Sequence, residues 1–525
     1  MDNYSTKLEM NDHLYEMGLG FVRERSRSGV ESHIKAIERV SAWACFHHPG
    51  RFADGALENY ALEIGESLEK RIKSNGIAIP DMKPSQSRTL HLVSTMYGVG
   101  GHSRFLVKWV ESDKSAEHII VLTDQKDEVP ELLQNVVKKS GNYLFCLPPD
   151  ASVESRALAV RKISKSCNRV VLHTHPNDSI PVIAFANEGG PPIAMFNHAH
   201  FSFNLGSTVS DIIINTIEYY RQISEKHRFA KRTAILAGTT GLWPIDDSRI
   251  DKEAAKKELL LPENATVIMS LAHEKYFRPM KGYNIYSTVR SILRKIPDAH
   301  MIIVGVKKDN PFVPDDLRSS SRVHLLGYVH NPILQYKACD IFLESFPMPS
   351  LGAVPESIAY GEAFPVPVYG PGESILRVQR TIYSYSYRPP DEATYVSYVE
   401  NLATKKTDIR AEARKMRAQL AEYQDHFEGH LYSLNNMIDG LKHSPSEIPA
   451  IKMIESDDCR ALADLDQSDI GEKINALLPF IPAIYHHAAA VHNGHQTSGA
   501  AIHRIARYLL RELKRKVKIF TKLTT

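Results

Sequence analysis

A glutamate behind a permissive loop is the first feature of the sequence that could do chemistry. The stretch FLESFPMPSLGAVPESIAYGEAFPV, residues 342–366, begins as a buried strand and passes through Pro, Gly and small residues before a helix carrying Glu356 in its first turn. Backbone N–H groups of residues 350–353 at that helix start suit phosphate oxygens. The carboxylate of Glu356 could accept hydrogen bonds from two vicinal ribose hydroxyls. The structural alternative is a glutamate that only complements the helix dipole.

Cations follow another predicted strand end. In SLAHEKYFRPMKG, residues 270–282, a strand ends near Ala272 and is followed by Lys275, Arg278 and Lys281. Cations at the carboxyl end of a strand suit a diphosphate. A solvated charged loop is the commoner fate of such runs.

Histidines gather at two more strand ends. His173 and His175 flank the end of one strand, and His198 and His200 the end of another. A histidine at a strand end beside a cleft could act as a general base or bind the acceptor. Two-residue spacing also raises a metal site, but no third ligand follows at a clear spacing. A histidine satisfied within the core is the alternative.

A glycine turn opens the first α/β series. In YGVGGHSR, residues 97–104, Gly100 and Gly101 lie between a predicted strand and helix, so the backbone could approach a ligand closely. The spacing is not that of the dinucleotide fingerprint, and a plain strand–helix turn explains it equally well. The one DxD-like run, Asp464-Leu465-Asp466, falls in an acidic segment and is interpreted as solvated surface.

These residues need a scaffold, and the order of apolar runs predicts one. Residues 1–86 carry helical periodicity alone. From residue 88, strands and helices alternate in two consecutive series, which predicts two parallel sheets covered on both faces. Ligands bind beyond the carboxyl ends of such strands, so a cleft between two facing domains is expected. The predicted divisions are 1–86, 87–232, 233–441 and 442–525.

Bulk composition fits a soluble globular protein of two or three domains. The chain has 525 residues, of which 43% are hydrophobic and 24% charged, with a net charge of +3. The sequence shows neither a signal peptide nor an apolar run long enough to span a bilayer. Five widely spaced cysteines fit reduced thiols in the cytosol and not a structural zinc. We expect a cytoplasmic protein.

A basic amphipathic helix is predicted at the end of the chain. Between residues 500 and 523, apolar residues from Ile502 to Phe520 fall near one side and most of the eight Lys and Arg fill the rest. This is the pattern of an interfacial helix on anionic lipid, so peripheral association with the cytoplasmic membrane is expected. Packing on the protein's own surface is the alternative. Nucleic acid is not expected, because the segment lacks an aromatic platform.

The second α/β series resembles the nucleotide-binding half of GT-B fold glycosyltransferases, including the group 1 enzymes. The carrying stretches are SLAHEKYFRPMKGY, AHMIIVGV, VHLLGYV and, above all, the opening stretch with its Glu356, Gly361 and Pro365-Val366. Eleven residues separate Glu344 from Glu356. This longer loop, with its Phe-Pro step, is more similar to O-GlcNAc transferases and their bacterial relatives. The likeness covers roughly residues 88–425. It implies two facing Rossmann-like domains, whereas the N-terminal helical domain and the helical C-terminal tail are expected from the sequence pattern alone and lie outside the likeness.

The resemblance implies roles for single residues. Glu356 would bind the ribose, the loop Leu351-Gly352-Ala353 the diphosphate, and Lys275 and Arg278 the charge of the leaving nucleotide. The backbone of Tyr328 and Val329 would lie along the edge of the nucleotide base, and Gly100 and Gly101 would lie near the donor phosphate and the acceptor. The segment NHAHFSFNLG would bring His198 or His200 into the cleft as base or acceptor-binding group, with Glu344 a further candidate near the sugar.

Together these features predict a glycosyltransferase that needs no metal or other cofactor. It would move a sugar from a nucleoside-diphosphate sugar to a glycan or lipid-linked acceptor, in bacterial surface polysaccharide or lipopolysaccharide synthesis. A protein glycosyltransferase and a sugar-nucleotide epimerase of the same fold are alternatives. A non-catalytic sugar-nucleotide-binding scaffold is another, because Ser270-Leu271-Ala272-His273 replaces the usual Gly-Arg before the basic loop.

Overall fold

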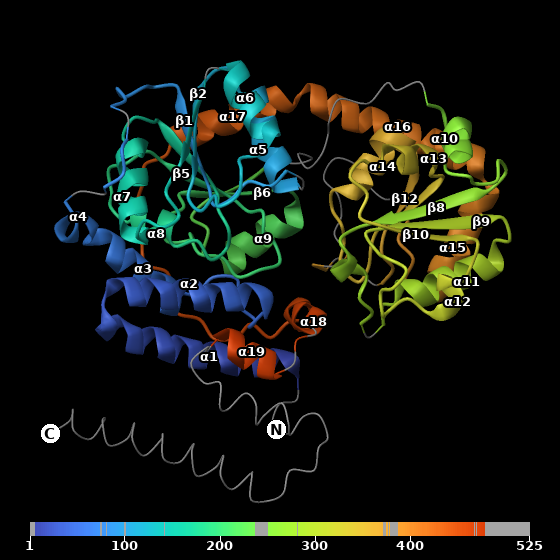
Figure 1. The fold of residues 1–525 in the computed structure, drawn as a ribbon, viewed down its shortest axis with the longest axis horizontal. Coiled ribbons are helices and arrows are strands. Elements are labelled where there is room, and N and C mark those ends of the chain that lie inside the picture. The colour runs from blue at the N-terminus through green and yellow to red at the C-terminus, as the bar shows by residue number, and fades with distance from the viewer. Residues whose placement is uncertain are drawn as a thin grey trace, which may run out of the picture.

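The computed structural model shows two α/β units side by side, with a layer of helices along the first (Figure 1). It describes residues 6–73, 76–79, 81–98, 101–140, 142–236, 250–280, 282–370, 374, 375, 377, 387–466, 468 and 470–477. The predicted helix at residues 500–523 lies outside these ranges and stays a prediction. None of the helices in these ranges is long and apolar enough to cross a membrane.

The first unit is built on seven parallel strands in the order β3-β2-β1-β4-β5-β6-β7. Strands β1, β4, β5 and β6 are buried along their whole length, as expected of a sheet covered on both faces. The strands are β1 (Arg88–Val93), β2 (Glu117–Leu122), β3 (Tyr143–Cys146), β4 (Arg169–His173), β5 (Ile193–Phe196), β6 (Ile212–Asn215) and β7 (Thr233–Ile235). The helices between them are α5 (Gly101–Ser112), α6 (Glu131–Ser140), α7 (Val153–Ser164), α8 (Ile180–Ala184) and α9 (Glu218–His227).

The N-terminal helices share a core with this sheet. They are α1 (Lys7–Arg25), η1 (Ser26–Ser28), α2 (Val30–Phe46), α3 (Gly55–Glu66) and α4 (Leu68–Arg71). Apolar side chains of α1, α2 and α3 belong to the same buried cluster as those of β1, β2 and β4. The helices therefore form an added layer on the first unit, and a division at residue 86 separates elements that are packed together.

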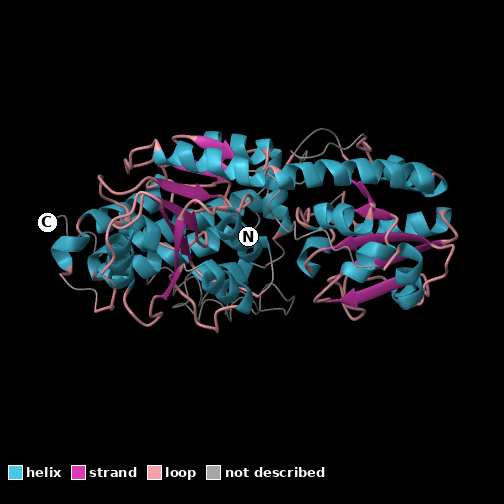
Figure 2. Cartoon of the chain, turned by 90° about the horizontal axis from the view of Figure 1, so that it is seen from above, coloured by secondary structure: helices cyan, strands magenta, loops and turns pink. Residues whose placement is uncertain are grey.

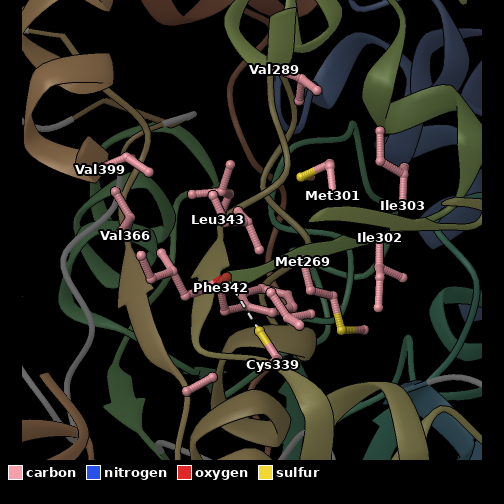
Figure 3. Close-up of a cluster of buried hydrophobic side chains, with 14 of the residues drawn as sticks. Met269, Val289, Met301, Ile302, Ile303, Cys339, Phe342, Leu343, Val366 and Val399 are labelled. Carbon is pink, nitrogen blue, oxygen red and sulfur yellow. Dashed lines mark hydrogen bonds between the residues drawn. The ribbon is translucent and has the colours of Figure 1, made fainter. Parts of the chain in front are cut away.

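The second unit has five parallel strands in the order β10-β9-β8-β11-β12. They are β8 (Thr266–Leu271), β9 (Ala299–Val304), β10 (Val323–Gly327), β11 (Ile341–Leu343) and β12 (Phe364–Val366). The helices of the unit are α10 (Lys252–Glu258), η2 (Glu274–Phe277), α11 (Ile285–Lys295), α12 (Asp315–Arg318), α13 (Ile333–Ala338), α14 (Ala353–Gly361) and α15 (Glu392–Thr404). One large apolar cluster fills both sides of the sheet (Figure 3). The predicted fold class, two parallel sheets of facing α/β units, is confirmed.

Two helices cross back from the second unit to the first. Helix α16 (Lys406–Asp425) packs near α14 and α15, and α17 (Phe427–Asp439) continues over the first unit (Figures 1 and 2). Buried side chains of α17 join those of α5, β4, β5 and β6. The segment 427–439, predicted within the second domain, thus packs on the first.

The acidic segment that follows contains two helices. Helices α18 (Asp457–Leu465) and α19 (Ile470–Leu477) pack against α1 and α2. The side chain of Asp458 accepts hydrogen bonds from the hydroxyl of Tyr219 on α9 and from the backbone of Ile375 in the second unit, the latter at 3.0 Å. The segment interpreted as a linker therefore joins the helical layer to both units.

Candidate functional site

Glu356 lies where the two units meet. It is in the first turn of α14, and its Oε1 is 2.8 Å from Nη1 of Arg104 on α5 of the first unit. Its Oε2 accepts a hydrogen bond of 2.9 Å from the hydroxyl of Tyr336, which is fully buried on α13. Burial raises the pKa of Glu356, against the opposing effects of Arg104 and Tyr336. The carboxylate is thus held between the units by two donors.

Helix α14 is fixed at its other end. Gly361 allows α14 to approach α13, because a Cβ there would lie 2.0 Å from the carbonyl oxygen of Tyr336. Glu362 follows with φ of 50°, and its carboxylate binds Arg410, Arg414 and Arg417 of α16. Arg414 and Arg417 hold the pKa of Glu362 below its usual value against the effect of burial. The direction in which Glu356 is presented therefore depends on packing over the whole unit.

The loop before α14 is shaped by Glu344. The Oε1 of Glu344 accepts from the backbone N–H of Ser350 at 3.1 Å and from its hydroxyl at 3.3 Å, and Glu344 is 4% exposed. Leu351 has φ of 48°, an uncommon conformation for a branched residue and one that clusters at ligand-binding loops. Gly352 is the N-cap of α14 and Ala353 its first residue. Glu344 supports the loop; a contact with sugar stays a prediction.

Lys275 and Arg278 lie just beyond the carboxyl end of β8. Lys275 is exposed in the short helix η2, and neither cation has an ion-pair partner among the residues that the structure describes. The charge of Lys275 is close enough to oppose the rise that burial causes in the pKa of Cys45 on α2. A backbone contact holds this loop, since a Cβ on Gly305 would lie 1.8 Å from the carbonyl oxygen of Ala272. The loop therefore carries two cations without an ion-pair partner in the described part of the chain, and Lys275 lies near a residue of the first unit.

The other predicted donor-site residues lie at the same kind of edge. Tyr328 and Val329 follow β10; Tyr328 is 69% exposed, and Val329 packs against the core of the second unit. Gly101 is the exposed first residue of α5, and Gly100 lies outside the described residues. A role for these four residues stays a prediction.

The two candidate bases have different surroundings. His200 is buried and stacks on Tyr220 with ring centroids 4.1 Å apart, and burial lowers its pKa to about 3. His198 is partly exposed, and its Nε2 lies 3.1 Å from Nδ1 of His173. The ring of His102, from the start of α5, meets that of His198 edge-on at 4.3 Å. Of the two histidines, His198 is the one placed to meet a ligand.

Sequence reasoning missed several residues around this site. Arg104 contacts Glu356 although 252 positions separate them, and nothing local to Arg104 indicates that contact. His91 and His118 continue a row of imidazoles inward from His173. Their signal was present, because His91 interrupts the apolar run of β1 and His118 directly precedes that of β2, but only the sheet order shows that they are neighbours.

The interpretation of Asp464-Leu465-Asp466 as solvated surface is wrong for one of its two carboxylates. Asp464 is exposed, but Asp466 bonds to His47 at 2.8 Å and to the fully buried Lys473 at 2.7 Å. These partners hold the pKa of Asp466 far below its usual value. Across the described ranges, no cluster of His, Cys, Asp and Glu is arranged to hold a metal ion.

Comparison with known proteins shows the fold. No protein-family model and no curated protein sequence matches the chain. An O-GlcNAc transferase mutant from Thermobaculum terrenum is similar in structure, with a TM-score of 0.50 and 14% identity over 82% of this chain and 84% of that one. HepE of Anabaena in complex with UDP has a TM-score of 0.50 at 13% identity, over 67% of this chain and all of that one. TarM of S. aureus, in a complex that includes UDP, has a TM-score of 0.50 at 9% identity over 68% and 100%. The chain thus has a GT-B glycosyltransferase-like fold.

Proposed function

We propose that the protein is a glycosyltransferase that uses a nucleoside-diphosphate sugar. One observation carries the proposal: Glu356, the loop at residues 351–353 and the unpaired Lys275 and Arg278 follow parallel strands of one sheet, and Glu356 and Lys275 lie near residues of the first unit. A carboxylate for vicinal hydroxyls beside cations and a helix N-terminus is the chemistry that binds a nucleoside diphosphate. The complexes of HepE and TarM with UDP, in the same fold, support this ligand class.

In the proposed reaction, His198 receives the proton of the acceptor hydroxyl. The acceptor oxygen keeps the electron pair and forms the new bond to C1 of the sugar. The bond from C1 to the diphosphate oxygen breaks, and the nucleoside diphosphate leaves with that pair. Lys275, Arg278 and the N-terminus of α14 stabilise the charge that develops on the leaving group, so we expect no requirement for a metal.

We further propose a glycan or lipid-linked acceptor of the kind used in bacterial surface polysaccharide synthesis. TarM was crystallised with α-GlcNAc-glycerol, which supports a glycan acceptor for this fold. Peripheral binding of anionic membrane by residues 500–523 would bring a lipid-linked acceptor to the cleft, and this part of the proposal rests on the sequence alone.

Thermal unfolding with a panel of UDP, GDP, CMP, TDP and ADP, each with and without EDTA, tests the donor site. A ligand that binds only the folded state, present at a concentration of about a hundred times its Kd, stabilises the folded protein by about 2.7 kcal/mol. We expect one nucleotide, with UDP tried first, to raise the Tm in EDTA. The shift should be lost in Glu356→Gln and kept in Glu263→Gln, because Glu263 is exposed before β8, at the opposite edge of the sheet.

Sugar transfer is then measured with the nucleotide sugar of the base identified and oligosaccharide or lipid-linked acceptors. No Tm shift with any nucleotide would favour a degenerate scaffold. A shift together with interconversion of the nucleotide sugar, and without transfer, would favour an epimerase.

A further inference from the structure

Four histidines form a continuous hydrogen-bonded row through the first unit. Nδ1 of His118 lies 3.0 Å from Nε2 of His91, whose Nδ1 lies 3.1 Å from Nε2 of His173. Nδ1 of His173 in turn lies 3.1 Å from Nε2 of His198. The first three imidazoles are buried, and His198 at the outer end is partly exposed.

The order of strands creates this row. His118, His91 and His173 lie on the neighbouring strands β2, β1 and β4, and His198 follows β5. His118 is paired with Thr89, which lies two residues before His91 on β1. His91 is paired with Val171, which lies two residues before His173 on β4, so each step along the row moves two residues along the next strand. A shift of two keeps all four side chains on one face of the sheet. Phe105 and Trp109 of α5 cover that face and contact the rings of His91 and His173.

The inner end of the row fixes its direction. Nε2 of His118 lies 2.9 Å from the backbone carbonyl oxygen of Asp113, which can only accept, so this nitrogen carries the hydrogen. In a neutral ring, Nδ1 of His118 then accepts, and His91 must donate from Nε2. The same argument passes through His173 to His198. Each Nε2 carries a hydrogen, and each Nδ1 carries a lone pair.

The surroundings favour the neutral form that this argument needs. Burial lowers the pKa of all four histidines, and neighbouring imidazoles or Arg169 lower those pKa values further, while Asp113 opposes the lowering at His118. Arg169 is buried and contacts Asp439 and Asp113, with Nη2 of Arg169 3.6 Å from Asp113. Nδ1 of His198 makes no hydrogen bond to any residue within the described ranges. The lone pair at the end of the row is thus available to a ligand.

We propose that His118, His91 and His173 are positioning residues that hold the imidazole of His198 in one tautomer, with hydrogen on Nε2 and the lone pair on Nδ1. The carbonyl of Asp113, at the far end of the row, selects that tautomer. The consequence for catalysis rests on the proposed function: Nδ1 of His198 is the atom that takes the proton of the acceptor hydroxyl.

Nitrogen NMR of the full chain labelled with ¹⁵N-histidine tests the tautomer without any substrate. We expect His198, assigned through His198→Gln, to show a protonated Nε2 and an unprotonated Nδ1 at neutral pH. His118→Phe removes the link to Asp113 and should give a mixture of both tautomers at His198. His118→Gln should restore the native state, because an amide supplies both a donor and an acceptor.

A second histidine pair gives a matched control. His300 and His324, on β9 and β10, are joined at 3.1 Å away from the row. Their signals should not change in His118→Phe if that variant is folded, and His324→Phe should leave His198 unchanged. The proposal would be overturned if His198 of the native protein carried its hydrogen on Nδ1. It would also be overturned if the tautomer of His198 were the same in His118→Phe and His173→Phe as in the native protein.

The kinetic arm separates this inference from the proposed function. If sugar transfer is found, His173→Phe should lower kcat on the order of 100-fold with little change in the donor KM, the range seen for loss of general-base catalysis. His118→Phe should lower kcat, and His118→Gln should restore it. A native NMR result as expected, with no transferase activity, would remove the catalytic role and leave the tautomer assignment intact. Transferase activity with kcat unchanged in His173→Phe would overturn the catalytic role.

Discussion

Arg104 and Glu356, from different α/β units, are joined at 2.8 Å where the two units meet. The arginine belongs to the helix that follows the glycine turn, and the glutamate to the helix that follows the phosphate-type loop. Tyr336 donates to the second carboxylate oxygen. A carboxylate has about four lone-pair sites, so these two donors leave room for hydroxyls of a ligand. The pair therefore orients the residue to which we assign ribose binding.

Removing either side of this pair should weaken nucleotide binding. Hydrogen bonds to charged groups contribute about 1.5–3 kcal/mol, so we expect Glu356→Gln and Arg104→Met to raise the Kd about 10-fold or more. Tyr336→Phe removes one neutral donor and should have a smaller effect. Calorimetric titration with the nucleotide found in the thermal panel measures this. An unchanged Kd in Glu356→Gln would rule out its ribose contact.

Lys275 and Arg278 should discriminate by the charge of the ligand. If they bind the diphosphate, Lys275→Ala should raise the Kd for a nucleoside diphosphate about 10-fold, which corresponds to about 1.4 kcal/mol. The Kd for the corresponding nucleoside should rise much less. The dependence of Kd on salt should also fall, because one exposed charge has been removed. Lys415→Ala is the control, since Lys415 is exposed on α16 and pairs with Glu412. Equal losses for diphosphate and nucleoside would place Lys275 elsewhere than at the phosphates.

Asp464 and Asp466, two residues apart, should differ in their contribution to stability. Asp466→Asn leaves Lys473, which is 0% exposed, without its charged partner. Such a loss is destabilising by about 3–5 kcal/mol when the pair is buried. Asp464 is exposed, and Asp464→Asn should change the free energy of unfolding by less than about 0.5 kcal/mol. Urea unfolding of both variants makes the comparison, and equal stabilities would mean that the ion pair contributes nothing.

His200 should make the fold sensitive to acid. Its folded pKa of about 3 lies below the unfolded value of 6.5. Below pH 6.5 the unfolded chain therefore binds more protons than the folded protein, and the free energy of unfolding decreases as the pH is lowered. The loss between pH 7.5 and 5.5 is about 1.4 kcal/mol for one such histidine. His200→Phe keeps a ring against Tyr220 and should remove that loss, whereas exposed His330→Phe should not.

Two buried carboxylates act in the opposite direction over the same range. Burial raises the pKa of Glu38 and of Glu58 to about 7, so folded protein binds protons there before the unfolded chain does. Their contribution increases stability as pH falls from 7 toward 4.5. The test of His200 is therefore the difference between variant and native protein at each pH. If both lose equal stability on acidification, His200 is not held neutral by the fold.

The sequence by itself determined the elements and the class of site. Short apolar runs such as TVIMSL and AHMIIV favour buried strands, and their alternation with amphipathic helices favours parallel sheets with ligand loops at one edge. Glu356, Lys275 and Arg278 could be named because a strand end or helix start is a local property of the chain.

Only the tertiary structure decided which residues meet. The strand order β2-β1-β4-β5 makes neighbours of four histidines scattered between positions 91 and 198. The placement of α5 against α14 brings Arg104 to Glu356, and the return of α18 and α19 buries Asp466 beside Lys473. Contacts of this kind depend on how elements distant in sequence pack. Hydrophobic periodicity indicates which face of an element is buried, but it does not indicate which other element packs against that face.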